Sequence, residues 1–215
     1  MSTDACMQFT CFGITLQRLA ADDLEMVRQW RNSSWVRPYM RYREVIGAEQ
    51  QIRWFQGLNE ECDWYFIARS GAVPFALFDI KAIDWATACG ESGGFVGDPG
   101  FIGRPEPAQA TLALMDFGFH LLRLQALQAR YSASLARLVR FNQQLGYAVT
   151  REGDDGFLYA EVSAERYSQQ AAPLRKAAIT THGPDATLTS SPPFLLGRLQ
   201  QSPTTNIPDL QLLVS

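Results

Sequence analysis

The stretch that most constrains the fold is residues 94–122, where a short strand, a turn and a Gly/Pro-rich loop lead into a long apolar helix. The strand is expected at residues 94–97, and DPG at residues 98–100 is typical of a tight turn. Residues 103–107 then hold one glycine and two prolines. The helix is expected over residues 108–122, with one apolar face made by Leu112, Met115, Phe119 and Leu122.

The rest of the pattern predicts an α+β domain. Further strands are expected at residues 12–19, 64–69, 75–83, 127–131, 147–151 and 157–162, and further helices at 24–32, 48–58 and 135–145. Gly146 is placed to end the last of these helices. This order predicts a mixed, mostly antiparallel sheet of about seven strands flanked by about four helices.

Composition predicts one domain followed by a tail. The chain has 215 residues, of which 47% are apolar and 19% charged, so it can bury a sizeable core. We expect this domain over residues 1–167. Residues 168–215 are rich in Pro, Ser and Thr and poor in charge, which predicts an irregular C-terminal tail, either disordered or draped over the domain. The apolar residues 194–196 suggest an arm that docks on a second copy, so a homodimer is one option.

Several partners are disfavoured. A net charge of −3 does not favour nucleic acid or an anionic membrane. No apolar run approaches the roughly 20 residues that span a bilayer, and residues 1–12 lack the features of a signal peptide. We therefore expect a cytoplasmic protein without nucleic-acid or membrane partners. Four cysteines without a C-x-x-C pair and only two histidines predict that no metal is bound.

Three stretches of the chain carry a resemblance to a known family. The first is VRQWRN at residues 27–32 with VRPYM at 36–40, and the second is GAEQQIRWF at 47–55. The third comprises GDP at 97–99, LMDFGF at 114–119 and FNQQLGY at 141–147. In this order they resemble the GCN5-related N-acetyltransferase (GNAT) superfamily over about residues 13–163. The nearest branches are the pseudaminic-acid-pathway acetyltransferases, which modify a UDP-linked 4-amino sugar, and the ribosomal-protein N-acetyltransferases.

The resemblance implies a GNAT fold with acetyl-CoA as co-substrate. In the family, a loop of the form [Q/R]-x-x-G-x-G/A binds the pyrophosphate through backbone N–H groups at a helix N-terminus. The present chain has IGRPEPAQ at residues 102–109. The implied cofactor-binding residues are Phe95, Val96 and Gly97 of the strand and Gly103, Arg104, Ala108 and Gln109 of the loop and helix.

This loop also departs from the family pattern. Pro105 and Pro107 stand in place of two glycines, and proline has no N–H to donate. Glu106 adds negative charge where a pyrophosphate would bind. The alternative interpretation is an ordinary helix start with Pro107 in the first turn. The loop therefore supports the fold and predicts weakened cofactor binding.

The catalytic residues are also implied by the resemblance. Glu91 is placed to act as general base toward the acceptor amine, and the alternative is a solvated glutamate at a strand edge. Asp79 and Asp84 are weaker candidates. Asn142 stands where many relatives have a tyrosine that acts as general acid, and an amide cannot donate a proton in that way. It could still form a hydrogen bond to the sulfur.

The acceptor would be a small-molecule primary amine, in the nearest branch a UDP-linked amino sugar. Backbone N–H groups near residues 94–96 would bind the acetyl oxygen. The residues implied to line the acceptor side are Trp30, Tyr39, Met40 and Tyr65, for which plain core packing is the alternative. Three functions remain open: an N-acetyltransferase, a degenerate GNAT domain that binds or scaffolds without transfer, and an acyltransferase that uses a protein N-terminus or another acyl-CoA.

Overall fold

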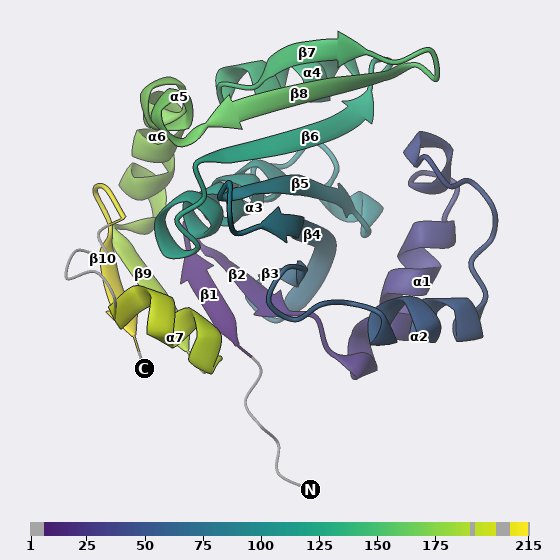
Figure 1. Ribbon diagram of the computed structural model, residues 1–215, viewed down its shortest axis with the longest axis horizontal. Coiled ribbons are helices and arrows are strands. Elements are labelled where there is room, and N and C mark those ends of the chain that lie inside the picture. The colour runs from purple at the N-terminus through teal and green to yellow at the C-terminus, as the bar shows by residue number, and fades with distance from the viewer. Residues whose placement is uncertain (1–6, 190–191, 201–206, 215) are drawn as a thin grey trace, which may run out of the picture.

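The protein is built on one open mixed sheet (Figure 1). The computed structural model describes residues 7–189, 192–200 and 207–214. Within these residues the sheet has ten strands, which in spatial order are β10 (Gln211–Val214), β9 (Asp185–Thr189), β1 (Gln8–Cys11), β2 (Ile14–Arg18), β3 (Trp64–Ser70), β4 (Val73–Asp84), β5 (Cys89–Val96), β6 (Ala126–Ser132), β8 (Phe157–Ser163) and β7 (Ala148–Glu152). Neighbours run antiparallel except for β5 with β6 and β9 with β10. The expected α+β fold class is confirmed, with more strands than expected.

Helices cover both faces of this sheet. The described residues contain α1 (Leu24–Asn32), α2 (Ala48–Gln56), α3 (Glu106–Asp116), α4 (Ala136–Gln144), α5 (Ala164–Gln170), α6 (Ala172–His182) and α7 (Pro193–Gln200). The expected apolar helix starts two residues early, and its last part, Phe117–Leu121, is a π-helical turn. Gly146 adopts a φ of 98° after α4, a conformation that favours glycine and ends the helix as expected.

The alternation of side chains along β3 separates two cores. Trp64 and Phe66 point to the α3 side, where their rings lie 5.3 and 5.1 Å from the ring of Phe117. Tyr65 and Ile67 point to the opposite face, where α1 and α2 pack. The core on the α1 and α2 side is much the smaller of the two. This face can therefore hold a cavity.

Strands β5 and β6 separate part-way along their length. They pair in parallel from Cys89–Ala126 to Ser92–Ala129. Beyond this point β5 continues beside β4 and β6 continues beside β8, without pairing with each other. We call the gap between residues 93–96 of β5 and 130–132 of β6 the wedge. The edge of β5 that faces the wedge has no strand partner, so its backbone groups remain available to a ligand.

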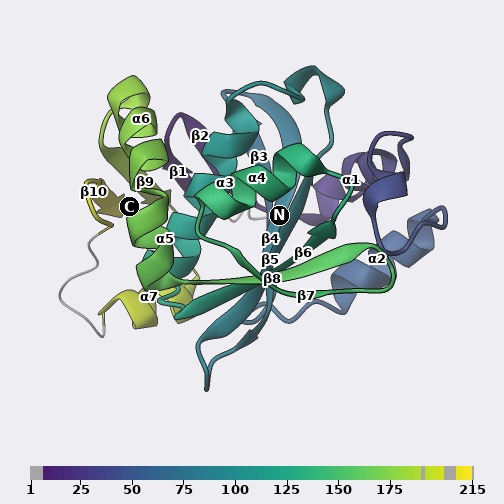
Figure 2. The ribbon, with the colours of Figure 1, turned by 90° about the horizontal axis from the view of Figure 1, so that it is seen from above.

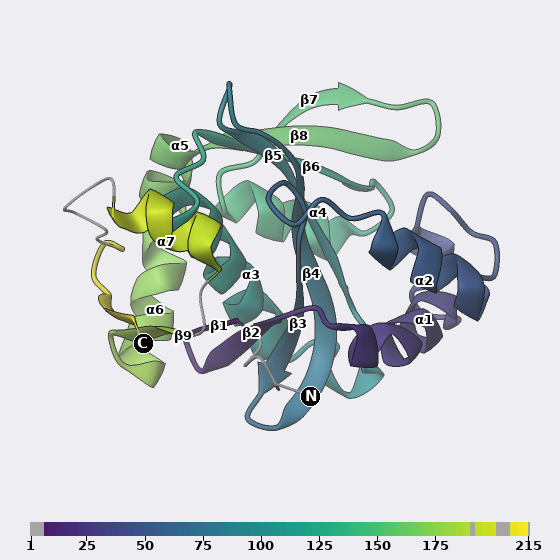
Figure 3. The same cartoon turned by 60° about the horizontal axis from the view of Figure 1, so that its bottom comes forward.

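The expectation of an irregular tail is wrong for the described part of residues 168–215. These residues form α6, α7 and two strands, and β9 extends the sheet by pairing with β1 through Phe9 and Leu188. Leu188 and Leu195 are fully buried. Figures 1 and 3 show these C-terminal elements gathered at one end of the molecule, with α1 and α2 at the other. The described part of this segment is therefore folded onto the domain rather than disordered.

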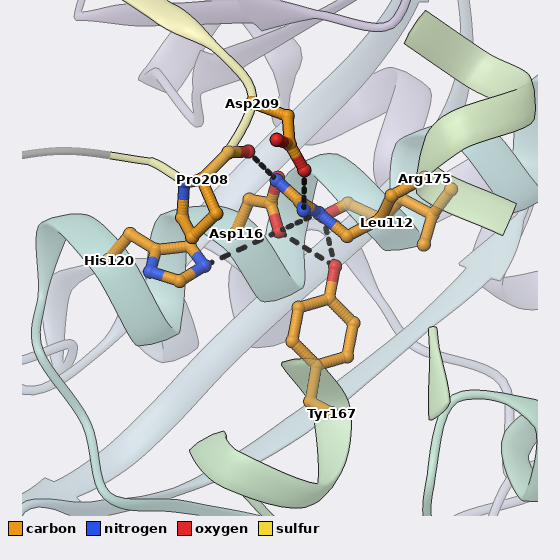
Figure 4. Close-up of polar contacts among 7 residues, drawn as sticks. All are labelled: Leu112, Asp116, His120, Tyr167, Arg175, Pro208 and Asp209. Carbon is orange, nitrogen blue, oxygen red and sulfur yellow. Dashed lines mark hydrogen bonds and ion pairs between the residues drawn. The ribbon is translucent and has the colours of Figure 1, made fainter. Parts of the chain in front are cut away.

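A buried ion pair fastens this C-terminal segment to α3. Figure 2 shows α5 and α6 running beside α3, and Figure 4 shows the contacts between them. Arg175 of α6 donates from Nε to Asp116 Oδ1 at 3.0 Å and from Nη2 to Oδ2 at 3.0 Å. Tyr167 of α5 donates to Asp116 Oδ1 at 2.8 Å, and Arg175 also donates to the carbonyl of Pro208 at 2.7 Å. Asp116 is 0% exposed, and this burial raises its pKa although Arg175 opposes the effect.

Candidate functional site

A cavity of about 420 Å³ lies between the sheet and the α1–α2 side. The residues at its floor come from β3, β4 and the last part of β5, next to the wedge. Five of the residues implied by sequence line it, namely Tyr39, Met40, Tyr65, Glu91 and Phe95. The structure therefore brings three of the four expected acceptor-side residues and the expected base to one cavity, while Trp30 lies outside it.

Two carboxylates and a lysine form an ionic cluster in this cavity. Lys81 Nζ lies 2.7 Å from Asp79 Oδ1 and 3.1 Å from Glu91 Oε1. Asp79 and Lys81 are two residues apart on β4, so their side chains point to the same face of the sheet. Glu91 of β5 is the direct cross-strand neighbour of Lys81. A Cβ at Gly93 would come within 3.1 Å of the Asp79 carboxylate, so glycine leaves this pair its space.

The buried position controls the charge of this cluster. Burial raises the pKa of Asp79, and Lys81 opposes that effect. Burial by itself would lower the pKa of Lys81, but the two carboxylates raise it overall, so the ammonium is retained. Asp79 was a weaker candidate from the sequence, and Lys81 was not predicted at all.

Three arginines that were not predicted as site residues also line the cavity. They are Arg31 of α1, Arg41 of the following loop and Arg130 of β6. Arg31 donates from Nη2 to the carbonyl of Tyr42 at 2.6 Å, while its buried Nη1 has no hydrogen-bond partner within the described residues. The lining therefore carries four cationic side chains against two carboxylates, an excess of two positive charges.

A second polar cluster lies on the other side of the wedge, toward α4. Ser92 donates to the carbonyl of Gln128 at 3.2 Å, and the hydroxyl of Tyr147 lies 2.5 Å from Ser92 Oγ. Asn142 of α4 is buried here, and so is Tyr131 of β6. Asn142 is therefore placed behind the wedge rather than in the cavity with Glu91. The hydroxyl of Tyr131 is buried beside the side chain of Asn142, which opposes part of the rise that burial causes in the pKa of Tyr131.

Most backbone N–H groups of the loop before α3 already donate hydrogen bonds within the loop. The N–H groups of Ile102, Arg104 and Ala108 bond to carbonyls within the loop. Arg104 forms a two-point ion pair with the carboxylate of Glu106, which is only 9% exposed. Such a carboxylate at a helix N-terminus occupies the kind of position that attracts a phosphate.

The remaining predicted residues lie outside the cavity. Gly97 packs against the ring of Trp30, where a Cβ would overlap the ring, and Trp35 donates to the Gly97 carbonyl at 3.1 Å. Val96 packs against the larger core. Gln109 forms a hydrogen bond of 2.8 Å with His182 at the end of α6. The cofactor roles expected for these residues remain predictions.

A CoA thioester bound as in the GNAT fold would meet two different environments. The wedge suits its thioester end, because β5 presents an edge there that pairs with no strand of the described residues. The loop suits its pyrophosphate less well, since Pro105 and Pro107 donate no hydrogen bond and Glu106 supplies a competing charge. These residues fit the group at the reacting end and only partly at the nucleotide end.

Other kinds of site find little support in the described part of the chain. Residues 7–189, 192–200 and 207–214 contain no cluster of three or more His, Cys, Asp or Glu side chains arranged to hold a metal ion. Among the helices of the same residues, none has the length and apolar character needed to cross a membrane.

Solved structures, two acetyltransferases among them, share this architecture. The aminoglycoside acetyltransferase AAC(6')-Ib, solved with coenzyme A, matches with a TM-score of 0.62 and 17% identity over 73% of this chain and 98% of that one. The spermidine N-acetyltransferase from Vibrio cholerae, solved with CoA and spermine, matches with a TM-score of 0.64 and 12% identity over the same shares. A domain from Methanocaldococcus jannaschii matches with a TM-score of 0.58 and 19% identity over 70% and 97%. The chain has the GNAT fold.

At these identities the likeness concerns the GNAT fold alone. No protein-family model and no curated protein sequence matches the chain. The resemblance to the GNAT superfamily is thus confirmed at the level of fold, and the narrower resemblance to the amino-sugar branch stays a prediction.

Proposed function

We propose that the chain is an N-acetyltransferase that moves the acetyl group of acetyl-CoA to a primary amine by direct attack. The observation that carries this proposal is the wedge, which opens into a cavity containing two carboxylates. The thioester arm would enter from the α3 and α4 side, and the amine would approach from the cavity. Backbone N–H groups of residues 94–96, on the unpaired edge of β5, would bind the acetyl oxygen.

Glu91 would act as the general base. Its side chain is 35% exposed and lines the cavity at the start of the wedge, so an amine in the cavity can reach it. Asp79 is more deeply buried and is held by Lys81, which suits it to orient the ammonium rather than to exchange protons with solvent. Once deprotonated, the amine nitrogen can attack the acetyl carbon without a covalent enzyme intermediate.

The acceptor is proposed to be an amino sugar linked to a nucleotide. This rests on the amino-sugar resemblance and on the charge of the cavity, where Arg31, Arg41 and Arg130 surround the carboxylates. A diphosphate would satisfy the buried Nη1 of Arg31, which has no partner in the described residues. A polyamine such as spermine carries only positive charge and would be repelled by the same arginines.

A second candidate function is a domain that binds or scaffolds without transferring. The loop favours it, because Pro105 and Pro107 remove donors and Glu106 is already paired with Arg104. Each hydrogen bond to a charged acceptor contributes about 1.5–3 kcal/mol, so the loss of two would weaken CoA binding by about two to four orders of magnitude.

A transfer assay with a panel of amines separates these functions. Purified protein is given acetyl-CoA and, in parallel, a UDP-linked 4-amino sugar, spermine, an aminoglycoside and a peptide with a free N-terminus. Acetylated products are measured by mass spectrometry for the wild type, for Glu91→Gln, and for Glu152→Gln as a control at an exposed glutamate. We expect the UDP-linked sugar to be acetylated and Glu91→Gln alone to lose the activity. Acetylation of none of the amines would favour the binding module, and preference for the peptide would favour a protein substrate.

A further inference from the structure

The sequence contains two lysines, and they lie in opposite surroundings. Lys176 is exposed on α6. Lys81 lines the cavity from β4, where its side chain is 29% exposed. The arginines beside it stay protonated at neutral pH and therefore do not act as nucleophiles. Lys81 thus brings a primary amine of the chain itself into the cavity.

This amine lies beside the start of the wedge. Gly93 is the first wedge residue of β5, and a Cβ at this position would lie 3.3 Å from Lys81 Nζ. The backbone N–H groups proposed to bind the acetyl oxygen follow immediately, at residues 94–96. Glycine therefore leaves the space between Lys81 and the wedge open. A thioester whose oxygen is bound at residues 94–96 would present its acetyl carbon next to this amine.

Lys81 also has the base that acetyl transfer needs. Burial alone would lower its pKa, but Asp79 and Glu91 raise it overall, so the amine is held as an ammonium, which cannot attack a carbonyl. Glu91 Oε1 lies 3.1 Å from the same nitrogen, and the Glu91 side chain is 35% exposed, so a proton that it accepts can pass to solvent. Asp79 Oδ1 lies 2.7 Å from the nitrogen and holds it in place. Base and acceptor are thus already assembled, whereas an external amine must first bind.

We propose that Lys81 is an acetyl acceptor in its own chain, and that acetyl-CoA acetylates its Nζ when no external amine is bound. The proposal rests on the acetyltransferase function proposed above. Glu91 takes one proton from the ammonium, and the freed nitrogen bonds to the acetyl carbon. The carbon–sulfur bond breaks with its electron pair moving to sulfur. A second proton passes from the nitrogen to the sulfur, which leaves as the CoA thiol, and the amide nitrogen keeps one hydrogen.

Acetylation of Lys81 would regulate the cavity. An acetylated lysine carries no charge, so Asp79 and Glu91 lose the cation that they share. The new amide also lies between Glu91 and the wedge, where it keeps an external amine from reaching the base and the thioester together. The modified chain is therefore inactive toward other amines, and the modification limits transfer when acetyl-CoA is abundant and the acceptor is scarce.

Labelling with deuterated acetyl-CoA tests this assignment, because deuterium separates new acetyl groups from any acquired during expression. The full chain is incubated without an amine, and the acetylation of Lys81 and Lys176 is followed by mass spectrometry of its peptides. Acetic anhydride, which reacts with exposed amines without a binding site, provides the comparison. We expect acetyl-CoA to label Lys81 at least about tenfold faster than Lys176, and acetic anhydride to reverse this order. Glu91→Gln should slow the labelling of Lys81 by about a hundredfold or more, whereas Lys176→Arg should leave it unchanged.

Three results would overturn the proposal. In a protein that acetylates an external amine, labelling of Lys81 by acetyl-CoA no faster than that of Lys176 would remove the role of Lys81 and leave the acetyltransferase function standing. Labelling of Lys81 that Glu91→Gln does not slow, in a variant that still binds acetyl-CoA, would show that the amine reacts without the proposed base. A protein that acetylates neither Lys81 nor any external amine would overturn both the inference and the proposed function.

Discussion

Replacement of Arg175 by methionine tests how firmly the C-terminal segment is joined to the domain. The substitution removes three hydrogen bonds of 3.0–3.1 Å to Asp116 and leaves that carboxylate 0% exposed without its cation. The loss of one partner from a buried ion pair costs about 3–5 kcal/mol. Because a whole domain is stable by about 5–15 kcal/mol, the variant should lose a large part of its stability.

Urea unfolding followed by tryptophan fluorescence measures this cost, and a double variant provides the control. Asp116→Leu combined with Arg175→Met removes both charges, so it should recover at least half of the stability that Arg175→Met loses. The deficit of Arg175→Met should also shrink as the pH falls. A carboxylate whose folded-state pKa is raised destabilises the fold at high pH, and protonation at low pH relieves that penalty.

Two results would refute this reasoning. One is a loss of less than about 1 kcal/mol for Arg175→Met, which is the scale of an exposed ion pair and would place Asp116 in water. The other is a double variant as unstable as the sum of the two single variants, which would mean that the charges do not depend on each other. Either result would mean that the ion pair between Arg175 and Asp116 does not stabilise the packing of α6 against α3.

Three further outcomes follow from the site and its surroundings. Glu106→Gln should tighten acetyl-CoA binding about tenfold in calorimetry, because it frees Arg104 for the pyrophosphate; unchanged affinity would exclude competition by this carboxylate. Glu91→Gln should lower kcat about 10²- to 10⁴-fold in steady-state assays, and an unchanged kcat would remove it as base. Burial lowers the pKa of His120, so the stability it contributes is complete above about pH 6.5 and falls as the pH drops below that value. An NMR titration in which His120 is protonated at or above pH 6.5 would contradict this.

The sequence predicted the central part of the fold well because its signals are local. The strands β3, β4 and β8 lie within one or two residues of their expected positions, since alternating side chains and turn residues define them. The tail was mistaken because its structure depends on distant partners. Arg175 and Asp116 are 59 residues apart, and β9 shows its alternation over only five residues within a Pro- and Thr-rich stretch.

The candidate site was predicted in part for the same reason. Glu91 and Tyr65 were recognised by position, but the cationic lining depends on residues brought together from α1, β4 and β6. The apolar spacing in α2 is a poor guide to burial, because Ile52 is 46% exposed whereas Gln51 is buried beside the cavity. A helix that borders a cavity does not need an apolar face directed at the core.

The proposed function requires that the wedge accept the thioester of acetyl-CoA. Calorimetric titration of the full chain with acetyl-CoA tests it most directly. We predict a saturable heat with a dissociation constant in the micromolar to sub-millimolar range, weakened from that of an ordinary cofactor loop by Pro105, Pro107 and Glu106. The absence of binding at millimolar acetyl-CoA would contradict the claim.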